Sequence, residues 1–80
     1  MGLISEKNNI KVHLKSNAKV KGKDFHRFLV KSMHLVYVNR YIDEGDTYTL
    51  VIQNSNAFTK ELKEYEFVVS KEDVLEIEEI

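Results

Sequence analysis

Apolar and polar residues alternate along the chain from residue 10 to residue 21. The apolar positions share one parity and are Ile10, Val12, Leu14, Ala18 and Val20. Alternation of period two is typical of a β-strand that buries one face. Twelve residues are too long for one straight strand in a small domain, so we expect a bend at Ser16 and Asn17, which both favour turns.

The period of the pattern changes over residues 24–33. Four apolar residues there follow the i, i+3, i+4, i+8 spacing of a helix with one buried face. They are Phe25, Phe28, Leu29 and Met33. Asp24 precedes them, and aspartate is a favoured helix N-cap. The pattern therefore predicts a short helix over residues 24–33.

Residues 35–53 are predicted to form a β-hairpin. Residues 35–42 are rich in Val, Tyr and Ile on both parities, and residues 43–46 form a polar loop in which Gly45 suits a positive φ. Residues 47–53 alternate again. We expect Leu50 and Ile52 to be buried in a core whose other members are Val36, Val38 and Phe67.

A strand that is apolar on both faces is normally buried on both. One face of residues 35–42 would meet the core, and the other would carry Leu35, Tyr37 and Tyr41. We expect this second face to be covered by the helix over residues 24–33 or by another copy of the chain.

Two further strands are predicted near the end of the chain. Residues 54–63 fit either a short helix or a long loop. Residues 64–69 alternate as a strand, and Ser70-Lys71-Glu72-Asp73 is close to a capping box, which favours a single helical turn. Residues 74–78 then alternate as a last strand, with Leu75 and Ile77 inward and the glutamates outward.

Together these elements predict a mainly-β protein. Five short strands in a chain of 80 residues favour a small antiparallel barrel, because closure removes exposed strand edges. The single helical turn before the last strand is similar to that of SH3-like barrels, so we expect a five-stranded SH3-like barrel with a short helix over residues 24–33. The alternative is an α+β fold, an open antiparallel sheet with one or two helices. We expect one domain over residues 1–80, with residues 1–8 frayed.

Composition narrows the class of protein. The chain has no Cys, which excludes disulfides, thiolate metal sites and cysteine nucleophiles. No apolar run approaches the roughly 18 residues of a membrane span, and the start MGLISEKNN is not a secretory signal. We therefore expect a cytoplasmic protein that does not contact membranes.

No catalytic motif is present in the sequence. The three glycines are scattered, and no serine has a G-x-S-x-G context. His26 and His34 lie too far apart along a helix to share a metal ion, and the acids at residues 43–46 lack the ligand order of an EF-hand loop. We expect no enzyme, no metal site and no cofactor.

Charge is distributed unevenly along the chain. Residues 1–42 hold nine Lys/Arg and two acids, whereas residues 43–80 hold three Lys and eleven acids. The basic half includes a regular series of lysines that could follow a nucleic-acid backbone, since alternate strand residues are spaced about as widely as phosphates. The residues of this nucleic-acid hypothesis are Lys11, His13, Lys15, Lys19, Lys21 and Lys23. The competing hypothesis pairs Lys11 and Lys15 with Glu76 and Glu78 across neighbouring strands.

The function that we expect is a small non-catalytic binding module for a protein or small ligand, with self-association included. Its candidate contact residues are Tyr37, Tyr41, Phe28 and Arg40. The composition favours amino acids with AT-rich codons: there are 22 Lys, Asn and Ile, against seven Gly, Ala, Arg and Pro, whose codons are GC-rich. This bias suggests an AT-rich genome and fits an accessory protein of a phage or mobile element. A single-stranded nucleic-acid-binding protein is the alternative.

Overall fold

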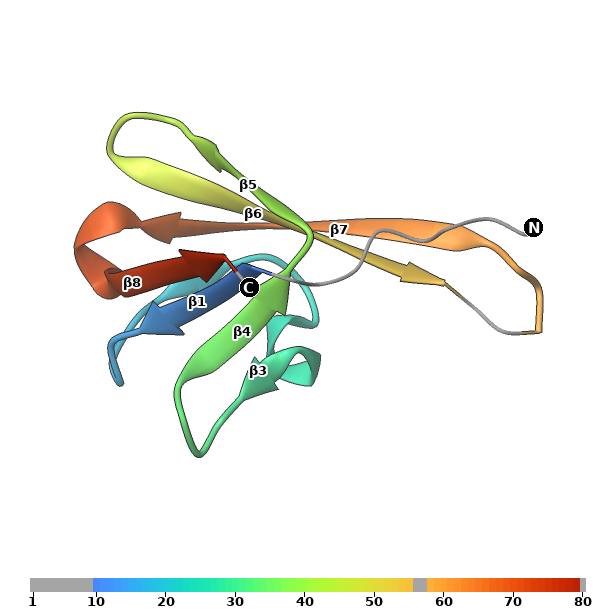
Figure 1. Ribbon diagram of the computed structural model, residues 1–80, viewed down its shortest axis with the longest axis horizontal. Coiled ribbons are helices and arrows are strands. Elements are labelled where there is room, and N and C mark those ends of the chain that lie inside the picture. Colours follow the sequence, from blue (N-terminus) through green and yellow to red (C-terminus); the bar gives the residue numbers. More distant parts are fainter. Residues whose placement is uncertain (1–9, 56–57, 80) are drawn as a thin grey trace.

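The computed structural model describes residues 10–55 and 58–79, and these ranges are mainly β-strand. The strands are β1 (Ile10–Leu14), β2 (Val20–Lys21), β3 (Leu29–Val30), β4 (Leu35–Val38), β5 (Arg40–Asp43), β6 (Thr47–Ser55), β7 (Leu62–Ser70) and β8 (Val74–Glu79) (Figure 1). Two short 3₁₀ turns connect some of them, η1 (Phe25–Arg27) and η2 (Lys71–Asp73). The predicted fraying of residues 1–8 lies outside the described residues. Within these ranges, no helix has the length and apolar character needed to cross a membrane.

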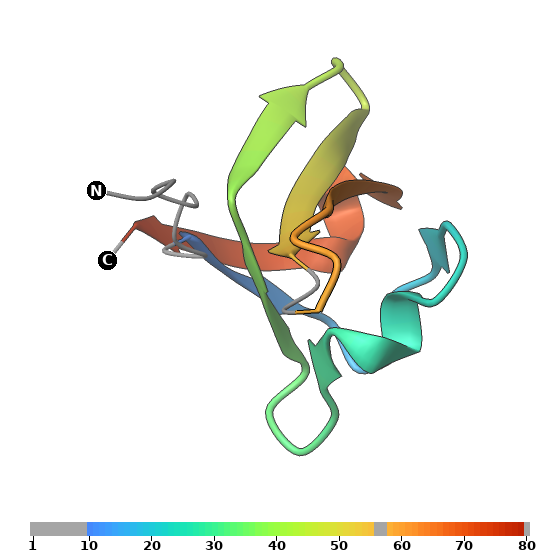
Figure 2. The ribbon, with the colours of Figure 1, turned by 90° about the vertical axis from the view of Figure 1, so that its right-hand side faces the viewer.

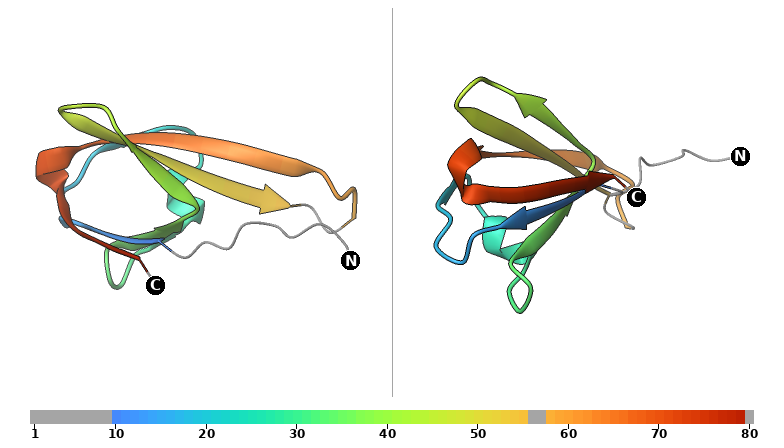
Figure 3. Two further views of the ribbon diagram at one scale, coloured as in Figure 1. Left: turned by 45° about the horizontal axis from the view of Figure 1, so that its top comes forward. Right: turned by 60° about the vertical axis from the view of Figure 1, so that its left-hand side comes forward.

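The strands form two four-stranded antiparallel sheets. The first sheet has the order β3-β4-β1-β8 and the second has the order β2-β7-β6-β5. The two sheets lie on opposite sides of the interior (Figures 2 and 3). The mainly-β prediction is confirmed, but the prediction of a closed SH3-like barrel is wrong. In the described ranges the outer strands of one sheet do not pair with those of the other.

Asn39 separates β4 from β5 and ties the two sheets together. Its backbone N–H donates to the carbonyl oxygen of Val51 (2.9 Å), and its side-chain Oδ1 accepts a hydrogen bond from the backbone N–H of Gln53 (2.7 Å). The residue is only 8% exposed, and a buried amide is stable there because its oxygen has a partner. The single strand predicted over residues 35–42 is therefore two strands in two sheets.

The bend at Asn39 also changes which side chains face the core. Val38 lies opposite Ile10 and Tyr41 lies opposite Leu50, so both point inward. Strict alternation would place residues 38 and 41 on opposite faces. The prediction that Tyr41 shares a face with Tyr37 is wrong for this reason.

The inner faces of the sheets meet in one hydrophobic core. Its most deeply buried members are Val12, Val36, Val38, Leu50, Ile52, Phe67 and Val69. The predicted burial of Leu50 and Ile52 with Val36, Val38 and Phe67 is confirmed. The core is built by the alternate residues of β1, β4, β6 and β7, as the period-two pattern requires.

The helix predicted over residues 24–33 is wrong. This segment contains only η1 and the two-residue strand β3. Asp24 adopts a left-handed conformation (φ 65°) and its side chain caps nothing. Phe25 and Phe28 instead pack around the Phe67 ring, at centroid distances of 5.1 and 5.8 Å. The helical spacing of these rings reflects their long-range packing on Phe67. The alternative α+β fold is also wrong, because the described ranges contain no α-helix.

The second half of the chain is dominated by the long hairpin of β6 and β7. The two strands pair from Thr47 and Ser70 to Ser55 and Leu62, and the end of the hairpin projects beyond the rest of the molecule (Figure 1). Of the segment 54–63, predicted as a helix or a loop, residues 54–55 and 62–63 belong to β6 and β7, and residues 58–61 form a turn and irregular backbone. The described part of the segment therefore contains no helix, and residues 56–57 lie outside the described residues.

The helical turn predicted before the last strand is confirmed as η2, and β8 follows it. Leu75, predicted to point inward, is 65% exposed. The pairing of β1 with β8 shifts register at His13 and Leu14, so that Leu75 has no residue opposite it. An extra residue of this kind is a β-bulge, which redirects its side chain.

Candidate functional site

The outer face of the first sheet brings together ionisable side chains from β1, β4 and β8. Residues that lie opposite one another in an antiparallel ladder share a face. One row across the strands consists of Leu35, His13 and Glu76, and the next row consists of Tyr37, Lys11 and Glu78. We call Lys11, His13, Tyr37, Glu76 and Glu78 the polar face.

The buried residues of β1 fix the polar face in place. Ile10, Val12 and Leu14 point into the core, which directs the side chains of Lys11 and His13 to the other side of the sheet. Because β1 pairs with β4 on one edge and with β8 on the other, its backbone is held along both sides. The polar face therefore rests on paired strands and not on loops.

Lys11 and Glu78 form an ion pair within the polar face, with 3.8 Å between Lys11 Nζ and Glu78 Oε1. This confirms the predicted pairing of Lys11 with the last strand. The two side chains are partly exposed, so the pair adds little to stability and mainly sets the local charge. Lys15 does not complete the predicted pairing, because His13 lies opposite Glu76 and Lys15 follows the end of the strand.

Three potential metal ligands converge on the same face. One ligand atom from each of His13, Glu76 and Glu78 lies within 4.8 Å of the other two. Sequence reasoning compared His26 with His34 and missed this group. His13 is distant in sequence from the glutamates, and only the pairing of β1 with β8 brings them together.

The predicted contact residues Tyr37, Tyr41, Phe28 and Arg40 do not form one surface. Tyr41 packs edge-on against Tyr48 at 5.6 Å, and Phe28 packs on Tyr65 at 5.2 Å. Arg40 lies in the second sheet and binds Glu64, with 3.2 Å between Nη2 and Oε1. Tyr37 alone belongs to the polar face, where it is 38% exposed.

The predicted lysine series is divided between the two sheets. Lys11 lies in β1 of the first sheet, whereas Lys21 lies in β2 and pairs with β7 of the second sheet. Lys15, Lys19 and Lys23 lie in the connecting segments, and all three are exposed. The bend predicted at Ser16 and Asn17 is confirmed as a turn, and it prevents a single continuous line of cations.

A second charged cluster joins the loop after β5 to η2. Lys71 Nζ lies 2.6 Å from Asp43 Oδ1, which also accepts a hydrogen bond from the Gly45 N–H. The hydrogen bond from Lys71 lowers the pKa of Asp43, with help from the Gly45 N–H, and the Asp43 carboxylate raises the pKa of Lys71. The ammonium also lies 5.0 Å from the centre of the Tyr48 ring.

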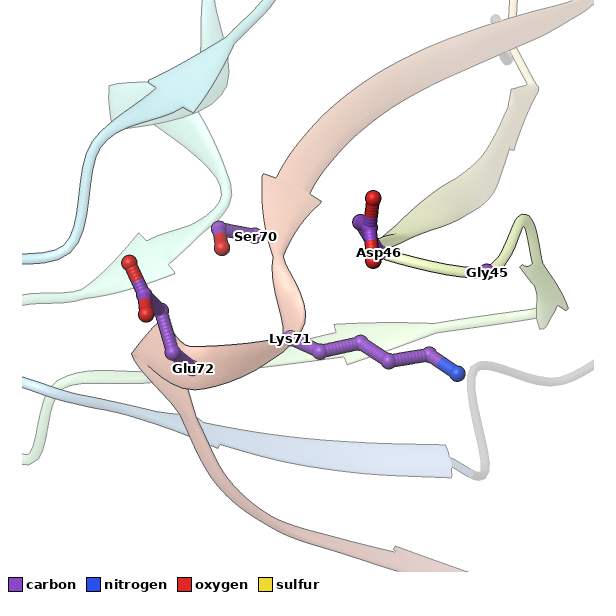
Figure 4. Close-up of a pocket in the computed structure, with 5 residues that line it drawn as sticks. All are labelled: Gly45, Asp46, Ser70, Lys71 and Glu72. Carbon is purple, nitrogen blue, oxygen red and sulfur yellow. The ribbon is translucent and has the colours of Figure 1, made fainter.

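This cluster borders a shallow polar pocket. The pocket is lined by Gly45, Asp46, Ser70, Lys71 and Glu72, and the side chains of Lys71 and Glu72 point in different directions (Figure 4). The Lys71 ammonium beside this pocket is engaged by Asp43. Comparison of this chain with models of protein families, with curated proteins and with solved structures found no significant match.

Proposed function

We propose that this chain is a small non-catalytic binding module that recognises a protein partner through the polar face. The observation that supports the proposal is the position of Tyr37. The residue is 38% exposed on a strand, directly beside Lys11, whose own neighbour is Glu78. Tyrosine is enriched at the energetic centres of protein interfaces, where polar groups commonly surround it.

The shape and charge of the polar face favour a protein over a small molecule. Small-ligand sites are concave and mostly apolar, whereas the polar face is one side of a β-sheet. It carries one exposed aromatic ring together with charges of both signs. Charges of both signs beside an aromatic ring fix the orientation of a partner of complementary charge.

The proposal is tested by capture with matched variants. Wild-type protein, Tyr37→Ala and Ile42→Thr are immobilised and exposed to a nuclease-treated lysate of the source organism, and retained proteins are identified by mass spectrometry. Ile42 is the control because it is an exposed apolar residue of the second sheet. We expect a protein that wild type and Ile42→Thr retain and Tyr37→Ala loses.

The captured protein is then purified and its affinity is measured. Loss of a central aromatic contact should weaken binding by about tenfold or more, whereas Ile42→Thr should bind as wild type does. Sedimentation equilibrium identifies the case in which the partner is a second copy of the chain. Equal retention by wild type and Tyr37→Ala would reject the polar face as the binding surface.

Nucleic-acid binding is the alternative function, and one observation favours it. Six cationic side chains between residues 15 and 31 are exposed: Lys15, Lys19, Lys21, Lys23, Arg27 and Lys31. Asp24 is the only acid in that segment. Such a local excess of positive charge attracts phosphates, and binding of that kind weakens steeply with added salt. Lys11 would contribute less to it, because Glu78 lies beside it.

A further inference from the structure

We propose that His13, Glu76 and Glu78 form a binding site for one divalent transition-metal ion of the zinc class. The three side chains come from adjacent strands, and their ligand atoms lie within 4.8 Å of one another. The site goes beyond the proposed binding function, because its three ligands come from this chain alone and need no protein partner to bind an ion.

The ligand set matches the chemistry of zinc. Imidazole nitrogen and carboxylate oxygen are both common zinc ligands, with bonds of about 2.0–2.2 Å, and three protein ligands with one open position describe many zinc sites. In a tetrahedral site with such bonds, neighbouring ligand atoms are about 3.3 Å apart. The present separations, none above 4.8 Å, therefore have to shrink by at most roughly one and a half ångströms, which rotation of the exposed glutamate side chains can supply.

The mixed ligand set distinguishes this site from the acidic loops of the molecule. His13 is half-buried on β1, between β4 and β8, and Glu76 lies directly opposite it. Glu78 is two residues further along the same strand, so its side chain shares the face with Glu76. The hairpin loop of Asp43, Glu44 and Asp46 offers carboxylates only, whereas an imidazole favours transition metals over calcium or magnesium.

Lys11 opposes the ion and sets the strength of the site. Its ammonium lies 3.8 Å from Glu78 Oε1, so it competes for one ligand and repels a divalent cation. Removal of this charge should strengthen metal binding about three- to tenfold, as expected for like charges a few ångströms apart at an exposed site.

The first experiment measures binding of Zn²⁺ by calorimetry and of Co²⁺ by visible absorption, with protein free of any affinity tag. Wild type should bind one ion per chain, and bound Co²⁺ should show the intensified absorption of low coordination number. His13→Asn and Glu76→Gln should each reduce affinity at least tenfold. Thermal melts of the metal-free variants establish that each one is folded.

The matched control is the double variant His26→Asn/His34→Asn. It removes the other two of the three histidines of the chain and leaves His13 in place, and asparagine is compatible with the positive φ of His34. This control should bind Zn²⁺ as wild type does. The proposal is overturned if wild type binds no Zn²⁺, if His13→Asn binds as tightly as wild type, or if the control variant alone loses binding.

A second readout locates the ion. In ¹H–¹⁵N spectra, Zn²⁺ should shift the amide resonances of residues 12–14 and 76–79 more than those of residues 43–46. Lys11→Gln should bind more tightly than wild type, for the reason given above. Shifts centred on the hairpin loop, or weaker binding by Lys11→Gln, would contradict the arrangement.

Discussion

Leu50 shows how much of the stability depends on single core side chains. It is fully buried, in a core cluster whose members come from both sheets. Leu50→Ala should cost about 2–5 kcal/mol, since it removes apolar contacts and leaves a cavity. That is a large share of the stability of a small domain. Urea denaturation should show a much lower midpoint, whereas Ile42→Val, at an exposed position, should change it little; similar midpoints for both variants would contradict the assignment of the core.

Gly22 is required by space and by backbone conformation together. Its φ is +142°, and a Cβ there would lie 2.4 Å from Cδ1 of Phe67 and 3.0 Å from the Glu66 carbonyl oxygen. Gly45 also has a positive φ (+95°), but a Cβ there would meet nothing within 4 Å. Backbone strain of this kind costs roughly 1–3 kcal/mol. Gly22→Ala should therefore lower the free energy of unfolding more than Gly45→Ala, and the reverse order would show that the contact with Phe67 is wrong.

The Asp43–Lys71 pair predicts a dependence of stability on pH. The pKa of Asp43 is lowered, chiefly by the hydrogen bond from Lys71, so its contribution is present above the ordinary value of 3.8 and is lost as pH falls through the lowered value. The raised pKa of Lys71 gives a contribution that is present below 10.5 and is lost as pH rises through the raised value.

Asp43→Asn should therefore be slightly less stable than wild type at neutral pH and equal to it in strong acid, where Asp43 is protonated. The neutral-pH difference should be small, because both side chains reach solvent. Denaturant melts over a series of pH values measure it. A difference that persists unchanged into strong acid would show that it has no electrostatic origin.

At the scale of elements, the local pattern of apolar and polar residues predicted most of the strands. It failed for residues 24–33, where it predicted a helix. The hairpin of β5 and β6, which is the part of the predicted 35–53 hairpin that the structure contains, and the turn η2 were predictable because alternation and turn residues act over a few positions. The segment 24–33 was not predictable in this way. Its aromatic rings pack against Phe67 and Tyr65 of β7, and tertiary contacts of that kind override local preference. The bend at Asn39 was not predicted, because a single polar residue within an apolar strand does not indicate that the chain passes from one sheet to the other.

The lysines of the segment from β1 to β2 separate the two proposed functions. Lys11, Lys15, Lys19 and Lys21 are changed together to Gln, and binding of a single-stranded oligonucleotide is measured over a range of salt concentrations. We expect no oligonucleotide binding by wild type at physiological salt, and a small loss of stability in the variant that comes mainly from Lys11. Micromolar binding by wild type that the variant loses, with a salt slope near one unit for each lysine engaged, would favour the nucleic-acid function.

At the scale of the whole molecule, the candidate site depends on long-range strand pairing that the local pattern of residues does not reveal. Composition and alternation were enough to predict a mainly-β chain and a core around Leu50, and the expected meeting of the first and last strands predicted that Lys11 pairs with an acid of the last strand. These patterns did not predict that Tyr37 and Tyr41 lie on different faces, or that His13 lies opposite Glu76. The separation of Tyr37 from Tyr41 depends on the change of side-chain parity at Asn39. The meeting of His13 and Glu76 depends on the register of β1 with β8, and register is decided by the complete set of pairings.

The projecting end of the β6–β7 hairpin has a consequence for motion. Near Leu50 and Phe67 the two strands are backed by the core, but near Asn54 and Leu62 their side chains are exposed. A two-stranded ribbon without a second layer is only marginally stable. The ladder should therefore open and close from its far end while the core stays folded, and amide protons should exchange with solvent progressively faster from Leu50 toward Asn54.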